Sequence, residues 1–207
     1  MPDYALEANM GGRVCGIDEA GRGPWAGPVV AAACVIDITQ LPKLLMTSLD
    51  DSKKLSAKKR ETLFAALEEE AALGSLHFAA GEASVEEVDT LNILRATLTA
   101  MTRAVDGLPI RPDHALVDGT ILPDLPCPAR AVPKGDGLSL SIAAASIVAK
   151  VTRDRLMAAL DQDYPGYGFA HNAGYGTAEH QAALARLGVT PHHRKSFAPI
   201  HKILCGS

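Results

Sequence analysis

The order of apolar and polar positions along the chain predicts short buried strands separated by helices. Apolar runs at residues 13–17 and 28–36 flank a glycine-rich turn, and shorter apolar runs follow at 76–81, 114–119 and 129–133. Apolar runs of this length, bounded by turn residues, are typical of strands that are covered on both faces.

Helix-capping residues mark the helices between these runs. Ser56 can cap a helix that continues to about residue 73 and ends at Gly74. Ser84 and Glu87 form a capping box, Ser-x-x-Glu, that opens a short helix. Further helices are predicted over 91–105, 139–161 and 177–187, and irregular chain over 41–56 and 164–176. Strands and helices mixed in this way predict one α/β sheet with helices on its faces.

The composition sets the broad class of the protein. With 207 residues, of which 47% are hydrophobic and 21% charged, the chain is long enough for one globular domain with a sizeable core. No apolar stretch approaches the length of a membrane span, and the first residues lack the pattern of a secretory signal. We therefore expect a cytoplasmic protein, with a monomer as the default state.

Cysteines and net charge narrow the choice of ligands only slightly. The four cysteines form no Cys-x-x-Cys pair, so a zinc site is not expected. The formal net charge of −4 argues weakly against a nucleic-acid partner. Basic residues nevertheless gather in three groups: Lys53, Lys54, Lys58, Lys59 and Arg60; Arg153 and Arg155; and His192, His193, Arg194 and Lys195. Each group alone is more typical of a solvated face, but three in one chain keep a nucleic-acid partner open.

An adjacent pair of carboxylates, Asp18 and Glu19, follows the first predicted strand. Adjacent side chains of a strand point to opposite faces, so we expect the pair to share a site only where the strand ends and the backbone turns. Because such a pair is repulsive without a cation, it indicates a divalent metal with oxygen ligands. The alternative is a pair of solvated turn residues.

The residues that follow, Gly21-Arg22-Gly23, favour the metal site over that alternative. Glycines let a ligand approach the backbone, and backbone amides beside an arginine can hold an anion. The turn is neither a P-loop nor a dinucleotide-binding fingerprint. Carboxylates for a metal beside groups for a phosphate predict metal-assisted phosphoryl chemistry.

Two further carboxylates come after later strands. Asp118 ends the run at 114–119, and Asp136 lies just past the run at 129–133. Because strand ends in open α/β sheets gather in one crevice, we expect both to join Asp18 and Glu19 there. With Mg²⁺ or Mn²⁺, such a set forms a two-ion site for attack of water on a phosphodiester. The alternative makes both turn residues, since Asp-Gly is common in turns.

The motifs together resemble the bacterial ribonuclease HII family, the type 2 ribonucleases H. The matching segments are 18–24 (Asp-Glu-Ala-Gly-Arg-Gly-Pro), 51–55 (Asp-Ser-Lys-Lys-Leu), 92–97 (Asn-Ile-Leu-Arg-Ala-Thr), 117–119 (Val-Asp-Gly), 134–136 (Lys-Gly-Asp), 142–154, 174–177 (Gly-Tyr-Gly-Thr) and 193–197 (His-Arg-Lys-Ser-Phe). They occur in family order and span nearly the whole chain, which argues against the turn-residue alternative.

The resemblance implies a ribonuclease H-like fold in a single catalytic domain over residues 1–207. This fold has a mixed five-stranded sheet flanked by helices and a helical portion over roughly 160–207. It implies cleavage of RNA in RNA–DNA hybrids, and nicking on the 5′ side of single ribonucleotides embedded in duplex DNA, with 3′-hydroxyl and 5′-phosphate products. The catalytic metal ligands it implies, for two Mg²⁺ or Mn²⁺ ions, are Asp18, Glu19, Asp118 and Asp136.

The residues expected to bind the substrate are Gly21, Arg22, Gly23, Lys53, Lys54 and Tyr175. By resemblance, the glycine-rich turn contacts the 2′-hydroxyl and phosphates of the ribonucleotide, and the tyrosine packs against the sugar at the RNA–DNA junction. The two lysines are expected to meet backbone phosphates as point charges. Asp154 is interpreted mainly as a structural ion-pair residue, the alternative being that it orients a metal ligand, and no histidine is expected to be catalytic.

Two positions depart from the family pattern. Ala173 stands where the family usually has a basic residue, which puts a phosphate contact there in doubt and suggests weaker affinity or salt dependence. Trp25 stands where a smaller apolar residue is more common, and it either packs at a core edge or lines the substrate groove.

Two other functions have to be weighed against the nuclease. A non-catalytic hybrid-binding module on the same fold would lack at least one of the four carboxylates, and all are present. A related transferase that joins polynucleotide strands usually requires additional domains, and nothing between the motifs suggests them.

Overall fold

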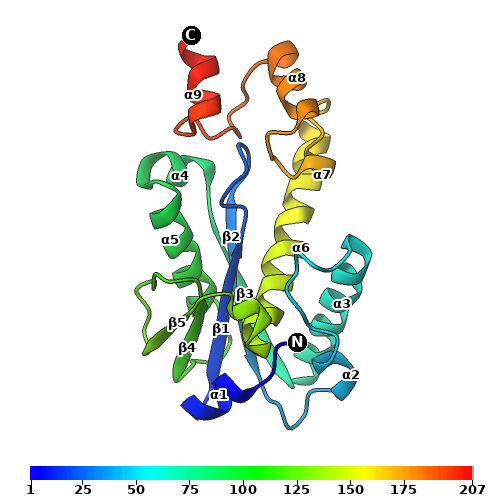
Figure 1. Cartoon of the computed structure of the whole chain (residues 1–207), viewed down its shortest axis with the longest axis vertical. Coiled ribbons are helices and arrows are strands. Elements are labelled where there is room, and N and C mark those ends of the chain that lie inside the picture. Colours follow the sequence, from blue (N-terminus) through cyan, green and yellow to red (C-terminus); the bar gives the residue numbers. More distant parts are fainter. Residues whose placement is uncertain (207) are drawn as a thin grey trace.

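A computed structural model describes residues 1–206 and has a mixed five-stranded sheet at its centre (Figure 1). The strands are β1 (Val14–Ala20), β2 (Val29–Ile36), β3 (Leu76–Ala83), β4 (His114–Asp118) and β5 (Ala129–Val132). Their spatial order is β3-β2-β1-β4-β5. β2 is antiparallel to β1 and β3, whereas β1, β4 and β5 run parallel. The predicted sheet is confirmed.

Helices cover both faces of this sheet. They are α1 (Ala5–Met10), α2 (Lys43–Met46), α3 (Ala57–Leu73), α4 (Val85–Leu91), α5 (Ile93–Asp106), α6 (Leu140–Asp163), α7 (Phe169–Asn172), α8 (Ala178–Leu187) and α9 (Ala198–Cys205), with a 3₁₀ turn, η1, at Gly135–Gly137. α6 crosses one face over β1 and β2 with α3 beside it, and α5 covers the other face (Figure 1). α8 and α9 lie at the end of the sheet that the β1–β2 loop reaches. No helix within residues 1–206 combines the length and the apolar character needed to cross a membrane.

Local signals determine several helix ends as predicted. The Ser56 side chain accepts a hydrogen bond from the Lys59 amide at the start of α3, and Gly74 ends that helix with a left-handed φ of 83°. The capping box at Ser84 opens α4. Asn92, with a φ of 71°, separates α4 from α5 and caps α5 with its side chain.

The short helices are where the structure differs from the prediction. No helix is predicted before residue 13, yet α1 is present, and the segments predicted as irregular each contain a single turn, α2 or α7. Helices this short are not stable by themselves. Each is held through a buried side chain, Glu7 in α1, Leu45 in α2 and Phe169 in α7, and such tertiary contacts leave no periodic pattern in the sequence.

Small side chains let α6 approach the sheet closely. Residues 31–33 of β2 and 143–145 of α6 are all alanines and are fully buried. A Cβ atom on Gly16 of β1 would come within 2.2 Å of the backbone of Ile142. The packing therefore requires glycine at this position and holds α6 directly over the strand that carries Asp18.

Candidate active site

Asp18 and Glu19 lie inside β1, which continues to Ala20. The prediction that the strand must end and turn at this pair was wrong. Both side chains nevertheless reach one site, because β4 stops pairing with β1 at Ile17 and leaves the edge of β1 open beyond it. The Glu19 amide, freed from the ladder, donates a hydrogen bond to the Asp18 carboxylate at 2.7 Å.

Asp118 and Asp136 reach the same end of the sheet from the neighbouring strands. Asp118 is the last residue of β4, directly past the pairing with β1. Asp136 lies in η1, which follows β5. The amide of Gly135 donates to the Asp118 carboxylate at 2.7 Å and so ties this 3₁₀ turn to the end of β4. The expected convergence of strand-end carboxylates is therefore present in the geometry.

Burial and mutual repulsion disfavour the charged forms of these carboxylates. Asp18 is only 2% exposed, and burial, then Glu19 and Asp118, raise its pKa well above the usual range. Burial also raises the pKa of Glu19, although the guanidinium of Arg22, 3.3 Å away, opposes that shift. Burial, with the charges of nearby carboxylates, raises the pKa of Asp136. An added cation would relieve this repulsion.

Lys53 is a second protein cation, besides Arg22, that faces this group. Its partial burial lowers its pKa, but the charges of Asp18, Asp136, Asp51 and Asp118 oppose burial and leave the pKa raised. Lys53 also lines two neighbouring hollows, one beside the glycine-rich turn and one that includes Asp118 and Asp136. Lys53 and Arg22 together carry fewer charges than these carboxylates, so the site favours further positive charge.

Asp51 is a carboxylate that the sequence analysis did not include in the site. It lines the same hollow as Asp118 and Asp136, and it accepts a hydrogen bond from the amide of Lys53 at 2.9 Å. Its place in the Asp-Ser-Lys-Lys-Leu motif was the available signal. Asp51 follows no strand, so the expectation that carboxylates at strand ends lie together did not include it.

The donor set of the site suits a hard divalent cation. Carboxylate oxygens are the ligands that Mg²⁺ and Mn²⁺ prefer. No group of three or more His, Cys, Asp or Glu side chains within residues 1–206 is already arranged to hold a metal ion. Since like-charged carboxylates keep apart without an ion, side-chain rotations of Asp18, Glu19 and Asp118 would be needed to close around one.

The glycine-rich turn forms one wall of the groove beside the carboxylates. Residues 21–23 line it together with Glu19, Lys53 and Tyr175. Tyr175 is 49% exposed, and its ring edge lies 3.4 Å from the position of a Cβ atom on Gly23. The structure therefore brings the predicted tyrosine and the predicted turn together at one groove.

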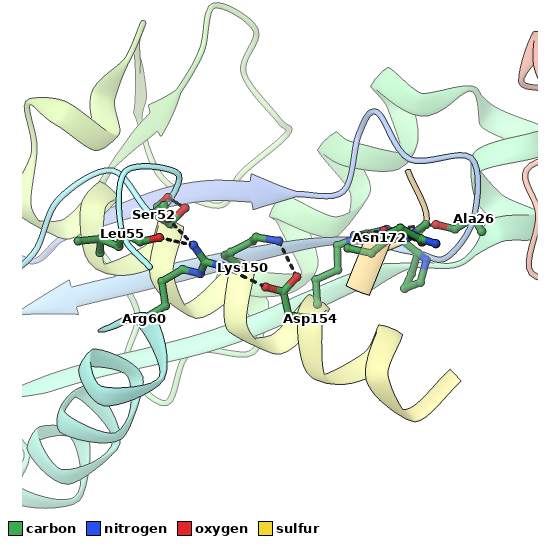
Figure 2. Close-up of polar contacts among 12 residues, drawn as sticks. Ala26, Ser52, Leu55, Arg60, Lys150, Asp154 and Asn172 are labelled. Carbon is green, nitrogen blue, oxygen red and sulfur yellow. Dashed lines mark hydrogen bonds and ion pairs between the residues drawn. The ribbon is translucent and has the colours of Figure 1, made fainter. Parts of the chain in front are cut away.

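The loop that carries Lys53 is fastened to α6 (Figure 2). Arg60 donates to the carbonyls of Ser52 at 3.0 Å and Leu55 at 2.6 Å, and it lies 3.7 Å from Asp154 of α6. Asp154 also pairs with Lys150, so its predicted role in structural ion pairs is confirmed. Arg60 belongs to a predicted basic group, but its side chain is turned toward the protein and only 14% exposed.

Three other members of the basic groups are buried, so the solvated face that is typical of such a group is not where these side chains lie. His193, Arg153 and Arg194 are at most 1% exposed. His193 pairs with His180 at 2.9 Å inside an aromatic cluster and so helps to hold this part of the fold together. The sequence shows that a side chain is basic, but it does not show whether distant backbone carbonyls accept hydrogen bonds from that side chain and so allow its burial.

The two departures from the family pattern also have a place in the structure. Trp25 packs in the cluster around Met157 and Tyr167, and a Cβ atom on Gly176 would come within 2.2 Å of its ring. The interpretation of Trp25 as a core-edge residue is confirmed. Ala173 ends α7 in a left-handed conformation, with a φ of 48°, and adds no charge beside Tyr175.

Comparison with known proteins agrees with this geometry. A family model described as Ribonuclease HII matches residues 15–200. A Ribonuclease HII of Paramagnetospirillum magneticum is 61% identical over 97% of each chain, and one of Rhodospirillum rubrum is 61% identical over the full chain and 94% of that relative.

Solved structures show the same fold. The ribonuclease H2 of Pyrococcus horikoshii superposes with a TM-score of 0.73 at 29% identity, covering 92% of this chain and 96% of that one. Bst-RNase HIII, solved in complex with Mn²⁺, gives a TM-score of 0.75 at 22% identity over 98% of this chain and 73% of that one. The chain thus belongs to the Ribonuclease HII family, metal-dependent endoribonucleases that act on RNA–DNA hybrids.

Proposed function

We propose that this chain hydrolyses RNA in RNA–DNA hybrids and nicks duplex DNA on the 5′ side of a single embedded ribonucleotide, leaving 3′-hydroxyl and 5′-phosphate ends. The proposal rests on one observation, that the carboxylates lie directly beside the groove. The carboxylates of β1, β4 and η1 adjoin a groove walled by the glycine-rich turn and Tyr175, and Lys53 lines both.

In this proposal Asp18, Glu19, Asp118 and Asp136 are the catalytic metal ligands. When bound, Mg²⁺ or Mn²⁺ supplies Lewis-acid polarisation of the phosphoryl oxygen and activation of water at neutral pH. The Gly135 amide holds the Asp118 carboxylate in one orientation. The raised pKa of Lys53 keeps its proton in place, so it remains a cation beside the reacting phosphate.

The groove supplies the contacts that distinguish RNA from DNA. Residues 21–23 can reach the 2′-hydroxyl through their backbone, and the exposed ring of Tyr175 can pack on a sugar without reading a base. Lys53 and Lys54 are both exposed toward the carboxylate hollow and can meet backbone phosphates. These contacts suit recognition that is independent of base sequence.

We further propose that residues 1–207 act as one catalytic domain, as a monomer in the cytoplasm. All four cysteines are free thiols, which fits a reducing compartment.

The test is cleavage of a labelled DNA duplex that carries one ribonucleotide, with Mg²⁺, with Mn²⁺ and with chelator. We expect a metal-dependent nick on the 5′ side of the ribonucleotide. Cleavage of long hybrids only would retain the nuclease but remove the junction-reading role of Tyr175 and the turn. Binding of both substrates without cleavage would favour the non-catalytic module.

A further inference from the structure

Two buried guanidinium groups lie directly behind the glycine-rich turn. Arg153 comes from α6 and Arg194 from the segment before α9, and both are at most 1% exposed. No carboxylate within residues 1–206 forms an ion pair with either of them. Buried charges are normally paired, so the surroundings of these two must supply another form of compensation.

Backbone carbonyls provide that compensation. Arg194 donates to the carbonyls of Gly21 at 2.6 Å, Arg22 at 3.0 Å, Gly27 at 2.9 Å and Pro28 at 3.1 Å. Arg153 donates to three carbonyls, those of Ala26 at 3.1 Å, Pro28 at 2.9 Å and Ala173 at 2.9 Å. The two guanidiniums thus draw the carbonyl oxygens at both ends of the loop, those of residues 21, 22 and 26–28, toward the interior.

The amide groups of the same loop divide into two sets. The amides of Trp25, Ala26 and Gly27 donate to the carbonyls of Gly174 and His192. Among residues 1–206, by contrast, no acceptor receives a hydrogen bond from the amides of residues 21–23, which line the groove. This second set is available to an anion or a hydroxyl group.

The position of Arg153 also explains the glycine at position 21. Gly21 has a φ of +95°, and a Cβ atom there would come within 1.9 Å of Nε of Arg153. Gly21 is therefore required by the guanidinium behind the turn, in addition to any ligand in front of it.

We propose that Arg153 and Arg194 are positioning residues that hold the loop carbonyls inward, so that the amides of residues 21–23 are presented to a phosphate or the 2′-hydroxyl of the substrate. The inference rests on the proposed function of the groove. Burial lowers the pKa of Arg194 to about 9 and that of Arg153 to about 10, so both remain charged at neutral pH. Their positive charge favours an anion in the groove.

The direct test is Arg194→Lys, which retains the charge but cannot reproduce contacts made from three nitrogens in a fixed fork. The matched control is Arg155→Lys, an exposed arginine of α6 paired with Glu61. Both variants and the wild type are measured for kcat and KM on a duplex with one ribonucleotide. They are also compared, in an Asp118→Asn background that prevents cutting, for binding of that duplex and of an all-DNA duplex.

We expect Arg194→Lys to lower the preference for the ribonucleotide duplex at least about tenfold, mainly through KM, with Arg155→Lys unchanged. A folded Arg194→Lys with the preference of the wild type would overturn the inference while leaving the nuclease assignment intact. Failure of the wild type to cleave either substrate would instead refute the proposed function.

If Arg194→Lys does not fold, the inference is tested by NMR on the variant that carries only Asp118→Asn, in which the loop amides are observed directly. Addition of the ribonucleotide duplex should shift the amide ¹⁵N–¹H resonances of residues 21–23. Those of residues 25–27, already bonded within the protein, serve as the internal control and should respond little. An equal response of both sets, or none, contradicts the inference.

Discussion

The two sides of the groove bury charge of opposite sign and compensate it differently. On the carboxylate side, Asp18 and Asp136 are buried and have raised pKa values, with Lys53 as a facing cation. On the turn side, Arg153 and Arg194 are surrounded by backbone carbonyls that satisfy their N–H groups. The carboxylate side is thus completed only by an added cation, whereas the turn side is preorganised. Substitutions on the carboxylate side should change activity because they change the charge of the site. Substitutions on the turn side should do so because they change the geometry of the loop.

The largest effect is expected from Asp118→Asn, which removes charge from the carboxylate side and retains an oxygen for the Gly135 amide. Loss of a metal-binding charge should reduce kcat at least about a thousandfold, or about 4 kcal/mol. Binding of an RNA–DNA hybrid should stay within a few-fold of the wild type. Loss of binding by the folded variant would contradict the assigned role, because the turn side is intact.

A fall in pH should destabilise the fold through the His180–His193 pair, which lies next to Tyr175 on the turn side of the groove. His180 links His193 to the carbonyl of Tyr175, with hydrogen bonds of 2.9 Å on both sides. Burial and the neighbouring imidazole lower the pKa of His193 to about 4. As pH falls below about 6.5 the unfolded chain takes up a proton that the folded state resists, so stability decreases down to about pH 4, by up to about 3 kcal/mol.

Urea unfolding over this pH range measures that loss. The His193→Gln variant lacks this titration, so its free energy of unfolding should fall less steeply than that of the wild type between about pH 6.5 and pH 4. Replacement of the exposed His201 is measured alongside as the control for removing one histidine. Equal slopes for His193→Gln and the wild type would show that His193 is not held neutral by the fold.

Gly21→Ala tests the geometry of the turn without changing charge. The new Cβ atom combines an unfavourable positive φ with the collision against Arg153. We expect a loss of about 2 kcal/mol in stability and a raised KM for the ribonucleotide duplex. Gly188→Ala is the control, since Gly188 has a φ of +80° and nothing within 4 Å of the added atom. A similar loss in both variants would assign the effect to backbone conformation alone.

The smallest effect is expected from Ala173→Lys, which places a cation beside Tyr175. It should tighten hybrid binding a few-fold, by about 0.5–1 kcal/mol, and steepen the salt dependence by roughly one phosphate contact. Leu73→Lys adds the same charge at an exposed position of α3. Binding measured over a salt series separates the two variants, and equal gains would indicate a nonspecific effect of net charge.

Local interactions explain what could be predicted from the sequence. Ser56, Gly74 and Ser84 act on backbone groups within a few residues, so their helix ends are as predicted. Asp118 is the last residue of the run that forms β4, and the parallel order of β1 and β4 brings it to the end of β1 that carries Asp18 and Glu19. The family motifs lie at these same positions, which is why fold and candidate carboxylates could be inferred together.

The sequence by itself therefore determined the strands, the capped helices and the set of carboxylates that their order brings to one edge. Only the tertiary structure decided which charges are exposed and which are buried. Arg194 donates to the carbonyl of Gly21 across 173 positions of the chain, and Asp51 enters the carboxylate hollow from a loop without a strand. The environment of a charge depends on segments that are distant along the chain, and no pattern of neighbouring residues encodes it.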